Sequence, residues 1–328
     1  MQRGPGAFLF LCSLLAGPPV GALEAASREV SFESAGYRLV GTLTIPAGPA
    51  LAAVLILPGS GPTDRNGASR LAPSMPPVYR QWAARLGDAG IGALRYDKRF
   101  LTHPDVDMPS FDQEAQIVDA VSAVGFLRST PEFASKPIFI AGHSEGGTLA
   151  PLVAERAGKI AGVAIVNTVQ FAADQLVLVQ LGAMNVPAEQ LDQLKQSFAR
   201  IKNGSFPRGR LLLGAGASYW AQWIKYSAAS PNTLSRSSTP LLLIQSLSDE
   251  TLPGGTLDRN LALLRGVASA NSKAQLHELQ GHDHQVMLPG SGEPSDEFMR
   301  ILTEWLRREA RATASPVPAS PSAPGTRD

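Results

Sequence analysis

The heptapeptide AGHSEGG, residues 141–147, has the residue types and spacing that nucleophilic catalysis requires. It follows the apolar run PIFI and precedes TLAPLVAERA, so it joins a predicted strand to a predicted helix. In such a tight turn the serine hydroxyl is pushed out over the sheet, where the helix N-terminus favours developing negative charge. Glycines flanking the serine remove side chains that would clash across the turn. We therefore predict that Ser144 is a nucleophile rather than a structural turn serine.

A serine nucleophile needs a base, which a histidine in a loop after a later strand would supply. Of the five histidines, His143 lies in the turn itself, His103 follows an early strand and His277 falls inside a predicted strand. The other two, His282 and His284, lie in LQGHDHQVM, directly after the last predicted strand. Spacing does not separate these two; we favour His284 and keep His282 as a neighbour or substrate-side residue.

The base in turn needs a carboxylate to fix its tautomer and stabilise the imidazolium. Asp249 follows the apolar run PLLLIQS, so it should lie at the carboxyl end of the penultimate strand, with Glu250 as the alternative. Asp283, beside the histidine, is interpreted as a loop residue, because a sequential neighbour seldom turns back to its own ring. The order Ser144, Asp249, His284 is the one expected when the nucleophile turn follows a central strand.

A serine attacking a carbonyl generates an oxyanion that needs preorganised N–H donors. We predict two backbone donors, Glu145 directly after the nucleophile and Ser60 in the loop LPGSGPTDRNG. Glycines in that loop allow close approach of the backbone. The loop lacks both the GxGxxG spacing and a following Gly-Lys-Ser/Thr, which argues against nucleotide binding.

The elements around these residues alternate between strand and helix. Continuous apolar runs at 52–58, 91–97, 137–142, 161–167, 240–246 and 274–280 are typical of strands covered on both faces. Amphipathic helix patterns occupy 77–90, 111–129, 145–158, 257–267 and 295–310, and two antiparallel strands joined at Ala35-Gly36 precede them. The sequence therefore predicts an α/β fold with a mostly parallel, doubly wound sheet and a site at the carboxyl ends of its strands.

The segment 168–238 contains helical patterns but no convincing strand, and strands resume directly after it. We predict a helical cap inserted between two parts of the core, 23–167 and 239–311. A separate helical domain is the alternative, which the short flanking linkers disfavour. Within this segment Trp220, Trp223 and Tyr226 recur at helical spacing, which favours core packing over a substrate wall.

The two ends of the chain differ from the rest. Arg3, the apolar run AFLFLCSLLA and the small residues at 20–22 predict a secretory signal peptide over 1–22. The run is too short to span a bilayer as a helix, so we expect a secreted or periplasmic protein without a stable membrane anchor. The Pro/Ala/Ser-rich segment 312–328 predicts a disordered tail.

Composition excludes several classes of function. The chain has 328 residues, 44% apolar and 17% charged, and a net charge of +1. Charges are scattered along it, which argues against a nucleic-acid partner. No cofactor or metal is expected, because His282 and His284 lack the spacing of a helical zinc motif and the only cysteine, Cys12, lies in the predicted signal peptide. The sequence leaves the oligomeric state open.

Five segments together resemble the α/β-hydrolases, of the secreted bacterial esterase-like kind with a helical cap: GHSEGG, LPGSGPTDRNG, LRYDKR, QSLSDETLP and LQGHDH. The resemblance covers nearly the whole chain after residue 22. In this family an Asn or Asp commonly precedes the catalytic histidine, which favours His284 over His282. Pro58 stands where the family commonly has a histidine, and Phe100 and Leu101 where it often has a glycine, so the pocket should have its own shape.

The function that follows is a serine hydrolase that cleaves small-molecule carboxylic esters through an acyl-enzyme on Ser144. A peptidase or amidase could use the same residues, and a binding protein that kept the fold but lost turnover is an alternative of another class. The charged run Arg95, Asp97, Lys98 and Arg99 at a strand end is interpreted as ion pairing that holds the turn, in preference to substrate binding.

Overall fold

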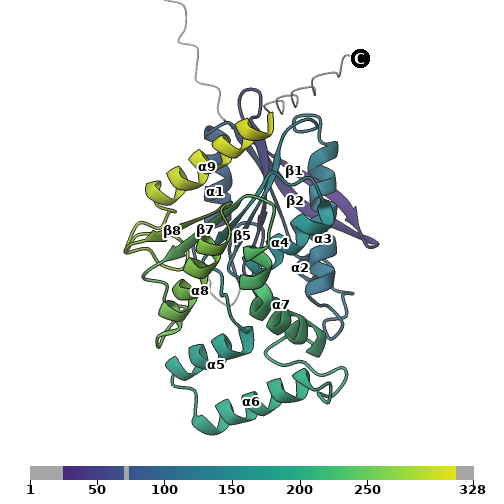
Figure 1. Ribbon diagram of the computed structural model, residues 1–328. Coiled ribbons are helices and arrows are strands. Elements are labelled where there is room, and N and C mark those ends of the chain that lie inside the picture. The colour runs from purple at the N-terminus through teal and green to yellow at the C-terminus, as the bar shows by residue number, and fades with distance from the viewer. Residues whose placement is uncertain (1–24, 70–73, 315–328) are drawn as a thin grey trace, which may run out of the picture.

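An eight-stranded sheet forms the centre of the protein in the computed structural model, which describes residues 25–69 and 74–314 (Figure 1). The strand order is β1-β2-β4-β3-β5-β6-β7-β8, and every neighbouring pair from β4 to β8 is parallel. The strands are β1 (Ala26–Ser34), β2 (Tyr37–Ile45), β3 (Ala52–Leu57), β4 (Ile91–Tyr96), β5 (Ile138–His143), β6 (Gly162–Val166), β7 (Leu241–Ser246) and β8 (Ala274–Leu279). The predicted mostly parallel sheet is confirmed.

Burial explains why the central strands have continuous apolar sequences. Every residue of β3, β4, β5 and β7 is buried, because helices cover both faces of the sheet. The antiparallel strands β1 and β2 form a hairpin, and positive φ angles of 49° at Ala35 and 83° at Gly36 make its two-residue turn. The predicted hairpin is therefore confirmed.

Two layers of helices pack on the sheet. On one face α1 and α9 contribute Trp82, Phe298 and Trp305 to a buried cluster. On the other face α3, α4 and α8 pack against the same strands, with Leu127 and Val153 among the buried side chains. The helices of the two layers, with the short α2, are α1 (Val78–Asp88), α2 (Arg99–Thr102), α3 (Gln113–Ser129), α4 (Glu145–Ala157), α8 (Thr256–Ala270) and α9 (Asp296–Ala314).

Three helices, α5 (Ala173–Ala183), α6 (Ala188–Lys202) and α7 (Ala217–Ser235), lie between β6 and β7. Residues 168–238, all of which the structure describes, contribute no strand to the sheet. The three helices share a buried cluster that includes Phe198, Trp220 and Trp223. In Figure 1, α5 and α6 project from the sheet at the opposite end of the molecule from α9, while α7 leads back toward α4.

The predicted signal peptide, 1–22, lies outside the described residues. The tail predicted over 312–328 needs a correction at its start, because α9 continues to Ala314. Alanine has the highest helix propensity, and the alanines at 310, 312 and 314 favour continuation of the helix beyond residue 311. Within 25–69 and 74–314, the helices are all too short or too polar to cross a membrane.

Candidate active site

Ser144 is the single residue that connects β5, which ends at His143, to α4, which begins at Glu145. Its backbone has φ of 55° and ψ of −120°, a left-handed conformation that costs free energy in any residue other than glycine. This strained strand-to-helix turn is the geometry that the sequence context predicts for a nucleophile. Ser144 is held there by its own N–H, which donates to the Val166 carbonyl at 2.9 Å.

The two glycines that flank Ser144 are required by space. A Cβ atom on Gly142 would lie 2.3 Å from the Gly146 carbonyl oxygen, and one on Gly146 would lie 2.3 Å from the carbonyl oxygen of Leu57. Both distances are far inside van der Waals contact with backbone atoms that cannot move. The motif therefore reflects the packing of the turn against β3 as well as its internal conformation.

Asp249 and His284 form a hydrogen-bonded pair. The His284 Nδ1 atom lies 2.9 Å from Oδ2 and 3.0 Å from Oδ1 of Asp249, and the carboxylate also accepts from the Thr251 hydroxyl at 2.7 Å. Burial lowers the pKa of His284, but the charge and hydrogen bond of Asp249 outweigh it, so this pKa lies above its ordinary value. Burial alone would raise the pKa of Asp249. The charge and hydrogen bond of His284 and the hydrogen bonds from Thr251 outweigh burial, so the pKa of Asp249 lies below its ordinary value.

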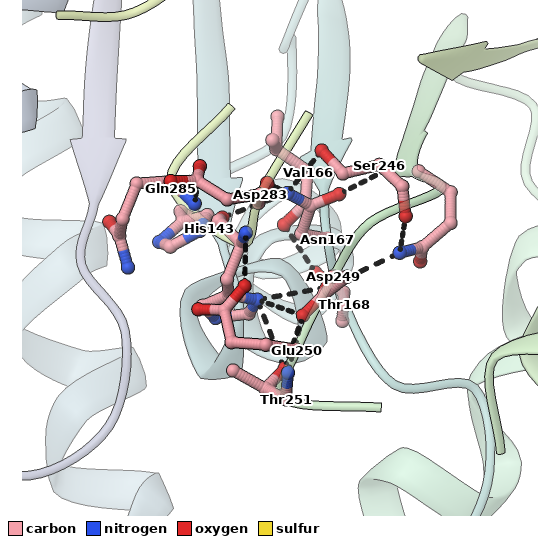
Figure 2. A network of polar contacts seen from close by, with 12 residues as sticks. His143, Val166, Asn167, Thr168, Ser246, Asp249, Glu250, Thr251, Asp283 and Gln285 are labelled. Carbon is pink, nitrogen blue, oxygen red and sulfur yellow. Dashed lines mark hydrogen bonds and ion pairs between the residues drawn. The ribbon is translucent and has the colours of Figure 1, made fainter. Parts of the chain in front are cut away.

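The loop that carries His284 is fixed from behind by polar contacts at strand ends (Figure 2). Asn167, directly after β6, donates from Nδ2 to the His284 carbonyl at 2.8 Å and to the Ser246 hydroxyl at 2.9 Å. Glu250, the alternative acid, accepts from the backbone N–H of His284 at 3.1 Å and makes no hydrogen bond to its ring. The carboxylate of Asp283 accepts from N–H groups of its own loop, as a loop residue would.

His143 connects three parts of the site. Its Nε2 lies 2.8 Å from the His284 carbonyl and its Nδ1 lies 2.8 Å from the Tyr79 hydroxyl, which itself accepts from the Gly59 N–H at 2.9 Å. Because a carbonyl can only accept, Nε2 carries the proton and Nδ1 accepts from Tyr79. Burial lowers the pKa of His143 to about 3, so the ring is neutral.

The loop after β3 lies directly against the nucleophile. A Cβ atom on Gly59 would lie 3.3 Å from Cβ and 3.7 Å from Oγ of Ser144, so a side chain at this position would crowd the nucleophile. The next N–H is that of Ser60, and it has no partner among the described residues. Glu145 is the first residue of α4, and the N–H groups of the first turn of a helix have no acceptor within the helix. Both predicted donors are therefore free to bind an oxyanion.

The segment RYDKR begins in the last two residues of β4, and its side chains Arg95, Asp97 and Lys98 brace this loop. The guanidinium of Arg95 donates to the side-chain carbonyl of Asn66, and Asp97 accepts from the Arg65 N–H at 2.9 Å. Lys98 reaches the loop nearer the nucleophile, at the Gly59 carbonyl. The sequence predicts that these charged residues hold their own turn. This prediction is too narrow, because most of them instead contact the loop after β3, beside Ser144.

Two cavities meet at the site. The smaller, of about 290 Å³, is lined by Ser60, Ser144, Glu145 and His284, so it brings together every predicted site residue except Asp249, which lies buried behind the histidine. The larger, of about 580 Å³, has aromatic walls from α7 and shares Ser60 and Trp223 with the smaller one. Ser144 and His284 both line the smaller cavity, and no hydrogen bond joins the serine hydroxyl to the histidine ring.

His282 points away from this space. Its ring lies between the Gln280 carbonyl, 2.9 Å from Nδ1, and the Ser295 hydroxyl, 2.6 Å from Nε2. His103 binds the Arg38 carbonyl and His277 lies in β8, both outside the two cavities. Throughout the described ranges, no three His, Cys, Asp or Glu side chains are grouped to hold a metal ion.

Sequence reasoning missed several residues that the structure places at the site. Asn167 had a visible signal, a polar residue at the carboxyl end of a buried parallel strand. Thr251 lies within the segment chosen for its acid, and its support of Asp249 depends on how the loop turns. Tyr79 and Tyr219 are on helices far away in the sequence, and nothing in their local pattern indicates the site.

Comparisons with known proteins bear on the fold and on the class of reaction. The chain matches no family model. It is 31% identical to the esterase EstD of Thermotoga maritima over 214 residues, which cover 63% of this chain and 48% of that protein. The chain thus spans about half the length of the curated relative it matches.

Solved structures share its fold across most of the chain. A lipase in an open form has a TM-score of 0.61 at 19% identity, covering 87% of this chain and 99% of the lipase. A proline iminopeptidase of Mycobacterium smegmatis has a TM-score of 0.58 at 15% identity, covering 87% of this chain and 100% of the peptidase. An esterase of Pyrococcus furiosus has a TM-score of 0.55 at 17% identity, covering 87% and 91%. The chain therefore has the α/β-hydrolase fold and is similar to esterases of that fold, as its motifs predicted.

Proposed function

We propose that this protein hydrolyses carboxylic esters by transferring the acyl group to Ser144. One observation carries the proposal: Ser144, on a strained strand-to-helix turn, faces the same cavity as His284, whose Nδ1 is occupied by Asp249. The similarity to the Thermotoga maritima esterase supports the same reaction. Its substrate would be a small molecule, since the two cavities have volumes of about 290 Å³ and 580 Å³.

The protonation state of His284 determines what it can do in the first step. The Asp249 carboxylate accepts from Nδ1, so in the neutral ring Nε2 keeps a lone pair and can act as a base. The Ser144 hydroxyl must turn toward Nε2 when substrate binds, since these groups are not hydrogen-bonded in the free protein; such contacts commonly tighten only with substrate present. His284 then takes the hydroxyl proton as Ser144 Oγ attacks the ester carbonyl, and Asp249 stabilises the resulting imidazolium.

Negative charge develops on the carbonyl oxygen as the new bond forms. The free N–H groups of Ser60 and Glu145 flank the serine and would donate to this oxygen in the tetrahedral intermediate. Collapse of the intermediate transfers the proton from His284 to the departing alcohol and leaves the acyl group on Ser144. Water then repeats the sequence, with His284 again as base, and releases the acid.

We further propose that α5, α6 and α7 act as a cap that selects the substrate. Tyr219, Trp220 and Trp223 of α7 line the larger cavity, together with Phe100 and Phe111 of the core. Aromatic walls of this kind favour an ester with an apolar acyl or alkyl group. An amide substrate would use the same attacking groups, so the substrate class must be measured.

The test is hydrolysis of 4-nitrophenyl esters and aminoacyl 4-nitroanilides by the wild type and Ser144→Ala. We expect ester turnover that exceeds anilide turnover in the wild type, and loss of both in the variant. A higher rate on anilides would assign a peptidase instead. If a folded wild type hydrolyses neither class and is not labelled by a fluorophosphonate, the result favours a binding protein on this fold.

Export of the protein is a separate proposal, supported by the charge and apolar run of residues 1–22. Expression of the full chain in a bacterial host, followed by mass spectrometry of the periplasmic and cytoplasmic fractions, tests it. We expect a periplasmic product that begins near residue 23. A full-length product confined to the cytoplasm would contradict the proposal.

A further inference from the structure

Lys98 places a buried cation directly behind the loop that carries Ser60. Its side chain is only 6% exposed. The ammonium donates to the Gly59 carbonyl at 2.6 Å, the Gly61 carbonyl at 3.1 Å and the Glu145 carboxylate at 3.3 Å. A buried ammonium is costly unless its three N–H groups are paired, and here each has an acceptor. The reaction proposed above assigns this group no part.

The hydrogen bond from Lys98 to the Gly59 carbonyl can affect the predicted oxyanion donor, because the Gly59 carbonyl carbon is bonded to the Ser60 nitrogen. This carbonyl and the N–H of Ser60 belong to one planar peptide unit, in which C=O and N–H point in opposite directions. A cation on the oxygen side therefore leaves the N–H directed away from Lys98, and it draws electron density toward the oxygen, which makes the N–H a stronger donor. On the other side of Gly59, the Tyr79 hydroxyl holds the preceding N–H at 2.9 Å.

The partner of Lys98 carries the second proposed donor. Glu145, 1% exposed, presents its backbone N–H beside Ser144 while its carboxylate turns away to Lys98. The same carboxylate accepts from Gln113 Nε2 at 2.6 Å and from the Tyr219 hydroxyl of α7. One ion pair thus joins the two backbone segments whose N–H groups would bind the oxyanion.

We propose that Lys98 is a positioning residue for the oxyanion hole, orienting and polarising the Gly59–Ser60 peptide, and that Glu145 holds Lys98 in place. The proposal rests on the ester hydrolysis proposed above. It requires that Lys98 act on the transition state, where charge reaches the carbonyl oxygen, and leave ground-state binding of the ester nearly unaffected.

The test compares Lys98→Met with Arg99→Met. Arg99 is also a buried cation in the same segment, but it pairs with Asp119, away from the oxyanion loop, and so provides a matched control. The readouts are kcat and KM for 4-nitrophenyl butyrate, per active site titrated with a fluorophosphonate, and the inhibition constant of an alkyl trifluoromethyl ketone, which forms a tetrahedral adduct with serine. Loss of folded protein alone lowers the titrated fraction but not the kcat per site.

For Lys98→Met we expect kcat per site to fall about 10- to 100-fold, somewhat less than the loss of a direct oxyanion donor, with KM within about twofold. The ketone should bind more weakly by a similar factor, and Arg99→Met should keep the wild-type kcat per site. If Lys98→Met does not fold, Glu145→Gln replaces it, because it removes the charge that holds Lys98 and keeps the backbone N–H.

Wild-type kcat per site in the folded variant, or an equal loss in Arg99→Met, would overturn the proposal. An inactive wild type would refute the proposed ester hydrolysis itself, and this inference with it, before any variant is compared.

Discussion

The Nε2 of His143 donates a hydrogen bond of 2.8 Å to the backbone carbonyl of His284. The residue before the nucleophile thus supports the loop that carries the proposed base, and the rings of the two histidines lie 4.7 Å apart. In this arrangement the Nδ1 of His143 is unprotonated, because it accepts from the Tyr79 hydroxyl, and protonation would break that hydrogen bond. The geometry of the site is therefore coupled to the neutral state of a buried histidine that takes no part in the chemistry.

This burial predicts a loss of stability in acid. Burial lowers the pKa of His143 to about 3 in the folded protein, whereas an unfolded histidine has its ordinary pKa of about 6.5. Between these values only the unfolded chain takes up the proton, so the stability present above pH 6.5 is lost as the pH falls toward 3. One such group lowers the free energy of unfolding by up to about 1.4 kcal/mol per pH unit.

Urea unfolding at pH 6.5, 5.5 and 4.5 measures this dependence. We expect the free energy of unfolding of His143→Gln to fall less steeply with acid than that of the wild type, by about the slope of one proton. Circular dichroism at pH 7 verifies that both proteins start folded. Equal slopes would show that His143 does not contribute to acid denaturation.

The pair of Asp249 and His284 predicts the pH dependence of catalysis. Only neutral His284 can take the serine proton, and its pKa lies above the ordinary value of a histidine, so kcat/KM should rise with pH through a midpoint above 6.5. In Asp249→Asn the carboxylate that raises this pKa is absent, so the midpoint should move to lower pH. The variant should also lose about 10⁴-fold in kcat, because the asparagine no longer enforces the right tautomer.

Glu250→Gln is the matched control for this prediction. It removes a neighbouring carboxylate that binds the His284 backbone N–H, and an amide oxygen can replace that acceptor. We expect kcat to fall by no more than about tenfold, the cost of one weakened hydrogen bond. A larger loss in Glu250→Gln than in Asp249→Asn would identify Glu250 as the acid.

Substitution of the two histidines of LQGHDHQVM should have opposite effects. His284→Ala should lower kcat by at least about 10⁴-fold with little change in melting temperature, because it removes the base. His282 is buried between the Gln280 carbonyl and the Ser295 hydroxyl, so His282→Ala should lower the melting temperature by several degrees and leave substantial activity per folded molecule. Steady-state kinetics and thermal unfolding of both variants show which histidine is the base. A large loss of kcat in His282→Ala, with activity kept in His284→Ala, would identify His282 as the base.

Substitution of Trp223 tests whether the proposed cap sets acyl-chain preference. It lines both cavities and stacks on Trp220, with ring centroids 5.4 Å apart. Trp223→Ala should widen the passage between the cavities, so kcat/KM for 4-nitrophenyl octanoate should rise relative to the acetate. Phe198→Ala is the control, because Phe198 packs on Trp220 but lines neither cavity. An unchanged ratio in Trp223→Ala would place the acyl chain elsewhere.

The sequence was sufficient to predict the sheet because its strands are buried on both faces and its helices are amphipathic. The turn at Ser144 was predictable for a similar reason: it needs glycines at 142 and 146 to avoid backbone atoms, so its geometry leaves a local pattern. Asp249 and His284 follow strands whose carboxyl ends must meet at one edge of the sheet.

The supporting residues leave no such pattern. Tyr79 approaches Gly59, and Tyr219 approaches Glu145, only after separate helices have packed on the core. Lys98 was visible as a charge at a strand end, but whether it paired within its own turn or with another loop depends on tertiary packing. Contacts between elements distant in the sequence, which sequence periodicity does not encode, therefore account for most of what was missed.

The most direct test of the account is labelling of Ser144. The wild type and Ser144→Ala, each verified as folded by circular dichroism, are incubated with a fluorophosphonate, digested and analysed by mass spectrometry. We predict one adduct per wild-type molecule, on the peptide that contains Ser144, with simultaneous loss of ester hydrolysis, and no adduct on the variant. A folded wild type that is not labelled, or one labelled at another serine, would contradict the assignment of Ser144 as the nucleophile.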